Sequence, residues 1–294
     1  MKLAHFGDRL AAAVEQKQSQ LVVGLDPVRG RLPDELRAEP DAASAFAAFC
    51  CGIVDAVAPY AVAVKPQSAF FEALGSDGVR AFEEVCAYSR AAGLVVIADA
   101  KRGDIGSTAR AYAAAFVEPR GSGPPLADAV TVNPYLGRDS VEPFLDACRT
   151  EGAGVFCLVK TSNPGGADVQ DAELADGRPL WQHVAALVRE WGDGLIGESG
   201  LSSVGAVVGA TFPREVGEAR RLLPETVLLL PGIGAQGGSA ADVAAAFTPN
   251  PASALVSASR SVIYAFRANG GDWRTAAGAE AERLAREVWA VSGR

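Results

Sequence analysis

The chain has 294 residues, of which 49% are hydrophobic and 21% charged, and its formal net charge is −8. Such an acidic chain lacks the basic face that a dedicated binder of nucleic acid or of an anionic membrane needs. No apolar run reaches the roughly 18 residues of a membrane span, and charged residues follow the start too closely for a signal peptide, so we expect a cytoplasmic protein.

The cysteines and histidines argue against several kinds of site. The five cysteines are odd in number and lack CxxC spacing, so we expect reduced, buried side chains rather than disulfides or a zinc site. Only two histidines are present, His5 and His183, and they lie far apart in the chain without nearby acidic ligands. We therefore expect neither a metal ion held by histidines nor a Ser-His-Asp triad.

Short apolar runs rich in β-branched residues alternate along the chain with longer alanine-rich stretches at helical spacing. The runs are almost continuously apolar, which is typical of parallel strands buried on both faces. In chain order, we expect strands at 21–26, 60–66, 94–101, 128–134, 154–161, 206–211, 226–232 and 254–259, and helices at 42–58, 77–92, 106–117, 139–151, 179–192, 214–222, 239–247 and 273–290.

This alternation predicts the fold class. Eight strands that alternate with eight helices are typical of a (β/α)8 TIM barrel, whose usual length is about 250 residues. A doubly wound open sheet is the alternative, but it would need a GxGxxG fingerprint after the first strand, where the sequence reads LVVGLDPVRG. We interpret the Gly-, Pro- and Ser-rich segments 119–125 and 163–178 as loop insertions and expect one domain over residues 1–294.

Polar residues follow nearly every expected strand, where a barrel places its active site. Three of the only five lysines, Lys65, Lys101 and Lys160, end apolar strands, although arginine carries most of the positive charge. A lysine ammonium is a compact charge that can give up its proton, whereas arginine effectively never does. A snorkelling side chain is the simple alternative for one lysine, but three lysines in such positions favour function.

The densest cluster of charge is DAKRGD at 99–104. In an extended strand Asp99 and Lys101 point to the same side, into the barrel mouth. Asp104 follows in the loop, where it can cap the next helix or reach a ligand. With Lys65, these residues can form an alternating network in which each group keeps its charge. A purely structural ion-pair network at the barrel rim is the alternative.

A second constellation follows the last two expected strands. PGIGAQGG at 231–238 can expose backbone N–H groups, and Arg260 in SASRS at 257–261 can add a bidentate contact. The loops after strands seven and eight are the recurrent phosphate site of barrels. We therefore expect these loops to bind a phosphate group, although a glycine-rich loop alone can be a simple turn.

An ordered set of segments extends over nearly the whole chain. The segments are LDP at 25–27, VKPQSAFFE at 64–72, DAKRGDIGSTA at 99–109, VNPYLG at 132–137, VKTSNPG at 159–165, VVGAT at 207–211, PGIGAQGG at 231–238 and SRSVIYA at 259–265. Together they resemble the orotidine 5′-phosphate decarboxylase family, in particular its longer bacterial form. The DxKxxD pattern alone is shared with other sugar-phosphate barrels, so the order of the whole set carries the resemblance.

The resemblance implies decarboxylation of orotidine 5′-phosphate to uridine 5′-phosphate, the last step of de novo pyrimidine nucleotide synthesis, with no metal or organic cofactor. It implies that Lys101 protonates carbon 6 of the pyrimidine, that Asp99 lies against the departing carboxylate and that Lys65 links Asp99 to the ribose hydroxyls. It also implies a homodimer in which Asp104, with Thr108, reaches the partner's ribose. The other implied ligands are Asp26 for the ribose, Thr161 and Ser162 for the pyrimidine, and Gly234, Gln236, Gly237 and Arg260 for the phosphate.

Two other functions stay open. A metal-dependent sugar-phosphate lyase or aldolase on the same barrel would share DxKxxD but would need a divalent cation. A non-catalytic phosphosugar-binding protein would need no proton donor, so the lysines and aspartates count against it. Two departures from the shorter family members are Gly106, which stands in place of a proline, and the inserted loops. The segment 162–178 and the loop after strand seven are both candidates for a lid.

Overall fold

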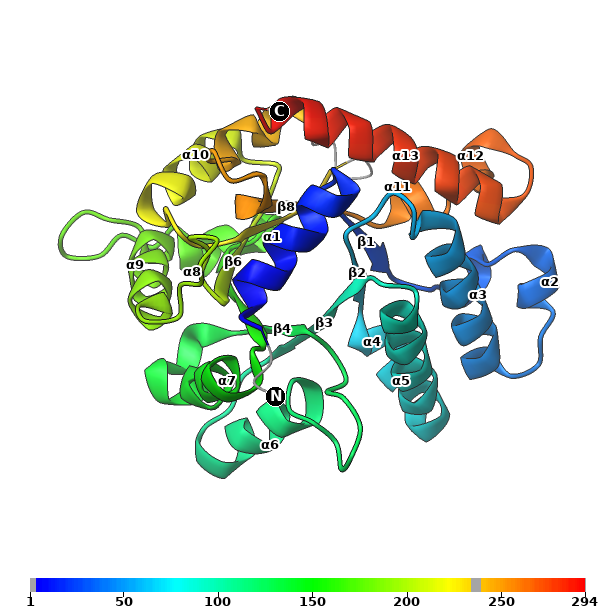
Figure 1. Cartoon of the computed structure of the whole chain (residues 1–294), viewed down its shortest axis with the longest axis horizontal. Coiled ribbons are helices and arrows are strands. Elements are labelled where there is room, and N and C mark those ends of the chain that lie inside the picture. Colours follow the sequence, from blue (N-terminus) through cyan, green and yellow to red (C-terminus); the bar gives the residue numbers. More distant parts are fainter. Residues whose placement is uncertain (1–3, 234–238, 294) are drawn as a thin grey trace.

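The computed structural model describes residues 4–233 and 239–293. Eight parallel strands close into a barrel in the order β1 to β8, and β8 pairs with β1 (Figure 1). The fold is therefore the expected (β/α)8 barrel and not an open doubly wound sheet. The strands are β1 Leu21–Leu25, β2 Ala63–Pro66, β3 Val95–Arg102, β4 Ala129–Val132, β5 Gly154–Lys160, β6 Val204–Val208, β7 Leu228–Pro231 and β8 Ala254–Ala258.

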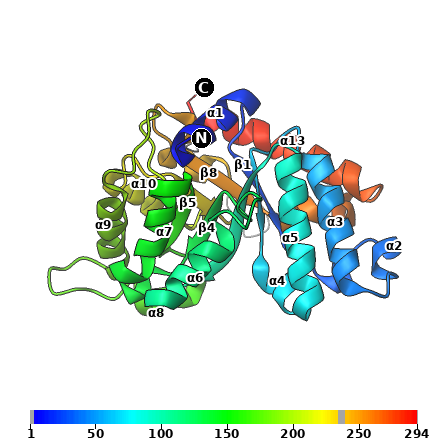
Figure 2. The same cartoon turned by 60° about the horizontal axis from the view of Figure 1, so that its bottom comes forward.

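Helices surround the barrel and connect most of its strands (Figures 1 and 2). Two of the longest begin at an aspartate whose carboxylate accepts backbone N–H groups of the first turn, Asp41 before α3 and Asp272 before α13. The helices are α1 Phe6–Lys17, α2 Asp34–Arg37, α3 Ala42–Val57, α4 Ser68–Glu72, α5 Gly75–Ala91, α6 Gly106–Phe116, α7 Arg138–Glu151, α8 Ala167–Gln170, α9 Leu180–Gly192, α10 Pro213–Leu222, α11 Arg260–Ile263, α12 Phe266–Asn269 and α13 Trp273–Val291. No helix in the described ranges is long and apolar enough to cross a membrane.

The strands are buried on both faces, which explains their nearly continuous apolar runs. In β1, Leu21, Val23 and Leu25 pack in the larger cluster with the surrounding helices, whereas Val22 belongs to a smaller cluster. This smaller cluster fills the barrel interior and includes Phe156 of β5. Alternate residues of each strand thus serve the two apolar regions of the fold.

The amino-terminal helix α1 closes one end of the barrel and is not among the helices expected from the sequence. Phe6, Leu10 and Val14 lie on one face of α1 and join the interior cluster, each at most 2% exposed. In Figure 2, α1 lies at one end of the barrel, while α4 and α8, which follow β2 and β5, lie at the other. That other end is the mouth toward which the polar strand ends point.

Two connecting segments differ from expectation. Residues 239–247, expected to be α-helical, contain a 3₁₀ helix over Ala241–Ala246, and Pro249 and Pro251 follow too closely for a longer helix to continue. The segment 163–178, expected to be a loop, contains a 3₁₀ turn at Pro164–Gly166 and the short helix α8. The remaining expected helices are present, with ends displaced by a few residues at most.

Candidate active site at the barrel mouth

An ion network joins β2 and β3 at the mouth. The Lys65 ammonium donates to Asp99 Oδ2, and the Lys101 ammonium lies 2.5 Å from Asp99 Oδ1. Lys65 and Asp99 are buried, whereas the side chain of Lys101 is 46% exposed and lines a cavity. Of the three residues that the structure brings together, Lys101 is thus the one that a ligand in the cavity can reach.

The charges in this network hold each other in the ionised state. Burial alone would raise the pKa of Asp99, but the ammonium groups of Lys65 and Lys101 hold that pKa well below its ordinary value. Burial alone would lower the pKa of Lys65, but the carboxylates of Asp99 and Asp26 outweigh burial, and the net shift is upward. Both shifts favour the charged forms, so a buried carboxylate and a buried ammonium persist at neutral pH.

The backbone conformation that brings Lys101 to Asp99 differs from the expected extended strand. An extended strand was expected to point both side chains the same way, but Lys101 has a left-handed backbone with φ of 47°. The pairing of β3 with β4 also shifts its register between Ala98 and Arg102. The expectation of regular strand geometry was wrong because a bulge interrupts β3, and the contact between the two side chains forms across that bulge.

Thr131 of β4 belongs to the same network, although it is not among the site residues expected from the sequence. The backbone N–H of Lys101 donates to Thr131 Oγ1, and the Thr131 hydroxyl donates to Asp99 Oδ1, both at 3.0 Å. Thr131 is 1% exposed. The available signal was that Thr131 is the polar residue within the apolar strand AVTV.

Asp26 lies directly after β1, beside the ends of β2 and β8. The Ser259 hydroxyl donates to Asp26 Oδ2 at 2.6 Å, while Asp26 Oδ1 is buried without a hydrogen-bond partner among the described residues. The Tyr264 hydroxyl donates to the backbone oxygen of Asp26 at 3.0 Å and so supports this turn. An unused carboxylate oxygen at this point suits a hydroxyl group of a ligand.

Asp104 and Thr108 do not join the network. Asp104 is half-buried, and its Oδ1 accepts the N–H of Ile105 at 2.8 Å. Of the two roles open to Asp104, a cap of the next helix or contact with a ligand, the cap is not formed among the described residues. Thr108 is exposed in the first turn of α6. Gly106 between them has φ of 55°. Proline cannot adopt this angle, because its ring holds φ near −65°, so glycine suits this turn.

A cavity of about 490 Å³ opens beside Lys101, and we call it the mouth cavity. The N–H of Thr161 donates to Gln170 Oε1 at 2.9 Å, and Gln170 Nε2 donates to Thr161 Oγ1 at 2.7 Å. Gln170 lies in the inserted segment, where the sequence gives no signal of this contact. The lining residues are Lys101, Leu158, Thr161, Ser162, Asn163, Gly165, Gly166, Val169, Gln170, Val207 and Pro231. Both residues expected to read the pyrimidine therefore share a cavity with Lys101.

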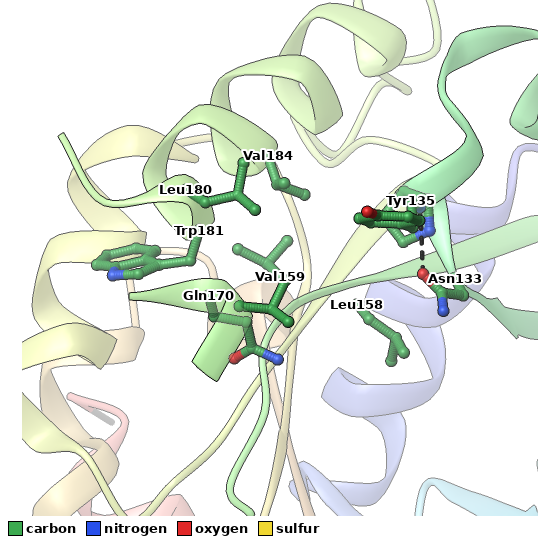
Figure 3. A pocket seen from close by; sticks show the side chains of 10 residues that line it. Asn133, Tyr135, Leu158, Val159, Gln170, Leu180, Trp181 and Val184 are labelled. Carbon is green, nitrogen blue, oxygen red and sulfur yellow. Dashed lines mark hydrogen bonds between the residues drawn. The ribbon is translucent and has the colours of Figure 1, made fainter. Parts of the chain in front are cut away.

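A second cavity of about 370 Å³ lies next to the mouth cavity and is mainly apolar. Figure 3 shows Leu180 and Val184 of α9 on one side of it and Tyr135 on the other. Asn133 Oδ1 accepts the N–H of Tyr135 at 3.1 Å, so Asn133 supports the turn after β4. The residues shared by the two cavities are Leu158, Val169 and Gln170.

Lys160, the third lysine at a strand end, does not line either cavity. Its side chain is buried, its ammonium pairs with Asp171 at the end of α8, and it lies 5.6 Å from the centre of the Phe212 ring. These contacts stabilise the inserted segment after β5. The position of a lysine at a strand end therefore identified two members of the network and one structural residue.

The expected phosphate site is described only in part. Pro231, the last residue of β7, pairs with Ser257 of β8. Pro231 and Arg260, which follows β8, therefore lie at the same end of the barrel. Arg260 is exposed at the first position of α11. Gly234, Gln236 and Gly237 lie outside the described residues. Within residues 4–233 and 239–293, no three His, Cys, Asp or Glu side chains are grouped as a metal site requires.

Comparison with known proteins identifies the family. A family model described as "Orotidine 5'-phosphate decarboxylase / HUMPS family" matches residues 19–267. A protein of Rhodopirellula baltica named orotidine 5′-phosphate decarboxylase is 48% identical over 89% of each chain, and a protein of the same name from Roseiflexus castenholzii is 45% identical over 95% of this chain and 96% of that one. The solved structure of Leishmania donovani OMP decarboxylase is 33% identical, with a TM-score of 0.77 and full coverage of both chains. The resemblance seen in the sequence motifs is thus confirmed, and the chain belongs to the orotidine 5′-phosphate decarboxylase / HUMPS family.

Proposed function

We propose that the protein converts orotidine 5′-phosphate to uridine 5′-phosphate and carbon dioxide without a metal ion or organic cofactor. The names of its relatives support the reaction. The observation that carries the mechanism is the Lys101 ammonium, held 2.5 Å from a buried carboxylate at the wall of the mouth cavity. A binding protein would not need a proton donor in this position.

The reaction requires a positive charge next to the reacting carbon. The bond between carbon 6 and its carboxylate breaks, carbon dioxide leaves, and the electron pair stays in an sp² orbital with little delocalisation. The Lys101 ammonium stabilises this developing charge and then gives its proton to carbon 6, after which the neutral amine takes a proton from water. In this proposal Asp99 keeps the Lys101 ammonium in position through their ion pair and also faces the substrate carboxylate.

The rest of the substrate supplies binding energy away from the reacting carbon. In this proposal Lys65 and Asp26 contact the ribose hydroxyls, and Asp26 Oδ1, which has no hydrogen-bond partner among the described residues, supports that role. Thr161 and Ser162 contact the pyrimidine. Arg260, with the segment that begins at Pro231, holds the phosphate, whose binding energy can be used to close the site around the reacting atoms.

A second copy of the chain is the proposed partner. Asp104 lies outside the network of its own subunit, which supports a role for it, with Thr108, at the ribose of the partner. The loops after the neighbouring strands β3 and β4 expose large apolar side chains, with Ile105 at 55%, Tyr135 at 77% and Leu136 at 49%. Exposed apolar side chains gathered on one edge are typical of surfaces that another protein covers.

The proposed reaction forms the pyrimidine nucleotide at the end of its de novo synthesis. All five cysteines are free and four of them are buried. Free thiols are typical of a reducing compartment, and this supports a cytoplasmic location.

The test follows the loss of orotidine 5′-phosphate absorbance with the purified protein, with and without a metal chelator. We expect equal rates and one uridine 5′-phosphate and one carbon dioxide per substrate consumed. Activity that the chelator abolishes would instead identify a metal-dependent lyase or aldolase. Binding of orotidine 5′-phosphate without turnover would identify a phosphosugar-binding protein.

A further inference from the structure

The backbone of Lys101 is held in an unusual conformation. Lys101 and Gln18 are the described non-glycine residues with positive φ, at 47° and 49°. Gln18 ends helix α1, where a left-handed residue is common. Lys101 lies within a strand, where a residue with a Cβ atom keeps this conformation only if its surroundings hold it there.

The holding contact comes from Thr131 on the neighbouring strand. Ala98 pairs with Val130 and Arg102 with Val132, so three residues of β3 face the single residue Thr131 of β4. The Lys101 N–H donates to Thr131 Oγ1 at 3.0 Å. The hydroxyl of Thr131 thus takes the place that a strand carbonyl has in a regular ladder, and it satisfies the amide at the left-handed position.

The same hydroxyl orients the carboxylate that holds the lysine. An amide N–H can only donate and an ionised carboxylate can only accept, so the single proton of Thr131 is directed to Asp99 Oδ1, 3.0 Å away. Asp99 Oδ1 therefore accepts hydrogen bonds from both the Thr131 hydroxyl and the Lys101 ammonium, while Asp99 Oδ2 accepts one from the Lys65 ammonium. Thr131 is 1% exposed, so water does not compete for these bonds.

From this geometry we infer that Thr131 is a positioning residue for proton transfer. Its hydroxyl fixes the main chain of Lys101 and the carboxylate of Asp99 together, and so sets where the Lys101 ammonium lies in the mouth cavity. The inference rests on the proposed decarboxylation and adds to it a residue outside DAKRGD. A merely structural threonine would affect stability and leave turnover by the folded protein unchanged.

Three variants test this role. Thr131→Val keeps the shape of the side chain and removes the hydroxyl, whereas Thr131→Ser keeps the hydroxyl. Thr226→Val is the control: it removes a hydroxyl that is also buried but lies before β7, at the opposite end of the strands. We expect Thr131→Val to lower kcat by about 100-fold, the scale of a small misplacement of a reacting group. KM should change far less, because Thr131 lies on β4, whereas Arg260, the described residue proposed to hold the phosphate, follows β8. Thr131→Ser should retain most of the kcat, and Thr226→Val all of it.

The outcomes separate this inference from the proposed function. If the wild-type protein does not turn over orotidine 5′-phosphate, both are wrong. If the wild type is active and folded Thr131→Val keeps its kcat, or if Thr131→Ser loses as much as Thr131→Val, only the role of Thr131 is wrong. If Thr131→Val does not fold, the kcat of Thr131→Cys is compared with that of Thr131→Ser. The two side chains are of nearly the same size, but sulfur forms only weak hydrogen bonds. We then expect the cysteine variant alone to lose kcat.

Discussion

The Lys101 ammonium lies 2.5 Å from Asp99 Oδ1 although only Ala100 separates the two residues and Lys101 has a left-handed backbone. Charge alone does not determine this arrangement, since a flexible lysine could approach Asp99 in many ways. The bulge in β3 and the hydrogen bond to Thr131 select one of them. A group whose position is set by the main chain needs little reorganisation when charge develops nearby, which is the property expected of an electrostatic catalyst.

Removal of the Asp99 carboxylate should destabilise the fold at neutral pH. Asp99→Asn removes the carboxylate that pairs with Lys101 and with the buried Lys65, and breaking such a buried pair costs about 3–5 kcal/mol of unfolding free energy. Urea denaturation at pH 7 measures this loss. The matched control is Asp77→Asn on the surface, which pairs with exposed Arg80 and should cost less than about 1 kcal/mol. Equal stability of Asp99→Asn and the wild type would contradict the prediction.

The same variant should change how stability depends on pH. The pKa of Asp99 lies below its ordinary value of 3.8 in the folded protein. The unfolded state therefore binds a proton first, so the stabilisation is present above pH 3.8 and is lost as the pH falls from there toward the folded pKa. We expect the wild type to lose more unfolding free energy between pH 5 and pH 2.5 than Asp99→Asn does. Parallel losses in the two proteins would show that Asp99 is not the group responsible.

Arg220 should be a major structural residue far from the mouth. Its guanidinium is buried and donates to five backbone carbonyls, and burial lowers its pKa to about 10 against the opposing effect of Glu225. The acceptors are the carbonyls of Ala246, Leu223, Pro224, Thr226 and Ser253. Arg220→Met should cost about 3–5 kcal/mol in urea denaturation, because buried carbonyls lose their donors. The exposed neighbour Arg221→Met should change stability by less than about 0.5 kcal/mol. Similar effects at both positions would refute this role.

Arg260 should act through the phosphate of the substrate. Arg260→Ala should lower kcat/KM for orotidine 5′-phosphate. The decrease should correspond to a loss of about 2–5 kcal/mol of transition-state stabilisation, the scale of a lost charge-assisted pair. The loss should be much smaller for orotidine, which has no phosphate. Exposed Arg267 on α12 provides the control substitution. Equal losses with the two substrates would mean that Arg260 does not hold the phosphate.

A shared active site predicts complementation between inactive subunits. Lys101→Ala and Asp104→Ala should each be inactive, but in a heterodimer one site collects both substitutions and the other has neither. Random exchange makes half of the dimers heterodimers, so about a quarter of the wild-type activity should return if sites act independently. Mixing followed by an activity assay measures it, with subunit exchange verified separately. A mixture that exchanges and stays inactive would mean that Asp104 serves its own subunit.

The barrel and the charged part of the site could be predicted from the sequence because both depend on repeating patterns. Buried parallel strands have apolar runs, and their carboxyl ends meet at one end of the barrel, so Lys65 and Asp99 were expected to lie together. The helical spacing of Phe6, Leu10 and Val14 does not show that α1 packs against the barrel end. That contact depends on the shape of the closed barrel.

The finer parts of the site depend on tertiary contacts that no local pattern reports. The left-handed conformation of Lys101 needs Thr131 from another strand, and the position of Thr161 needs Gln170 from an inserted segment. Lys160 matches the strand-end pattern of the other two lysines, yet its ammonium is directed to Asp171. A residue type at a strand end therefore predicts the region of the site more reliably than the direction of each side chain.

The most direct test of the account is the rate of orotidine 5′-phosphate decarboxylation by Lys101→Ala, with uridine 5′-phosphate binding measured on the same sample by calorimetry. We predict that kcat falls by several orders of magnitude while binding of the phosphate-bearing product largely survives, because Arg260, the described residue proposed to hold the phosphate, follows β8 and not β3. Lys17→Ala, which removes an ammonium that donates to the Ala58 carbonyl away from the mouth, should keep its kcat. A Lys101→Ala protein with near-normal kcat would contradict the central claim that Lys101 is the proton donor.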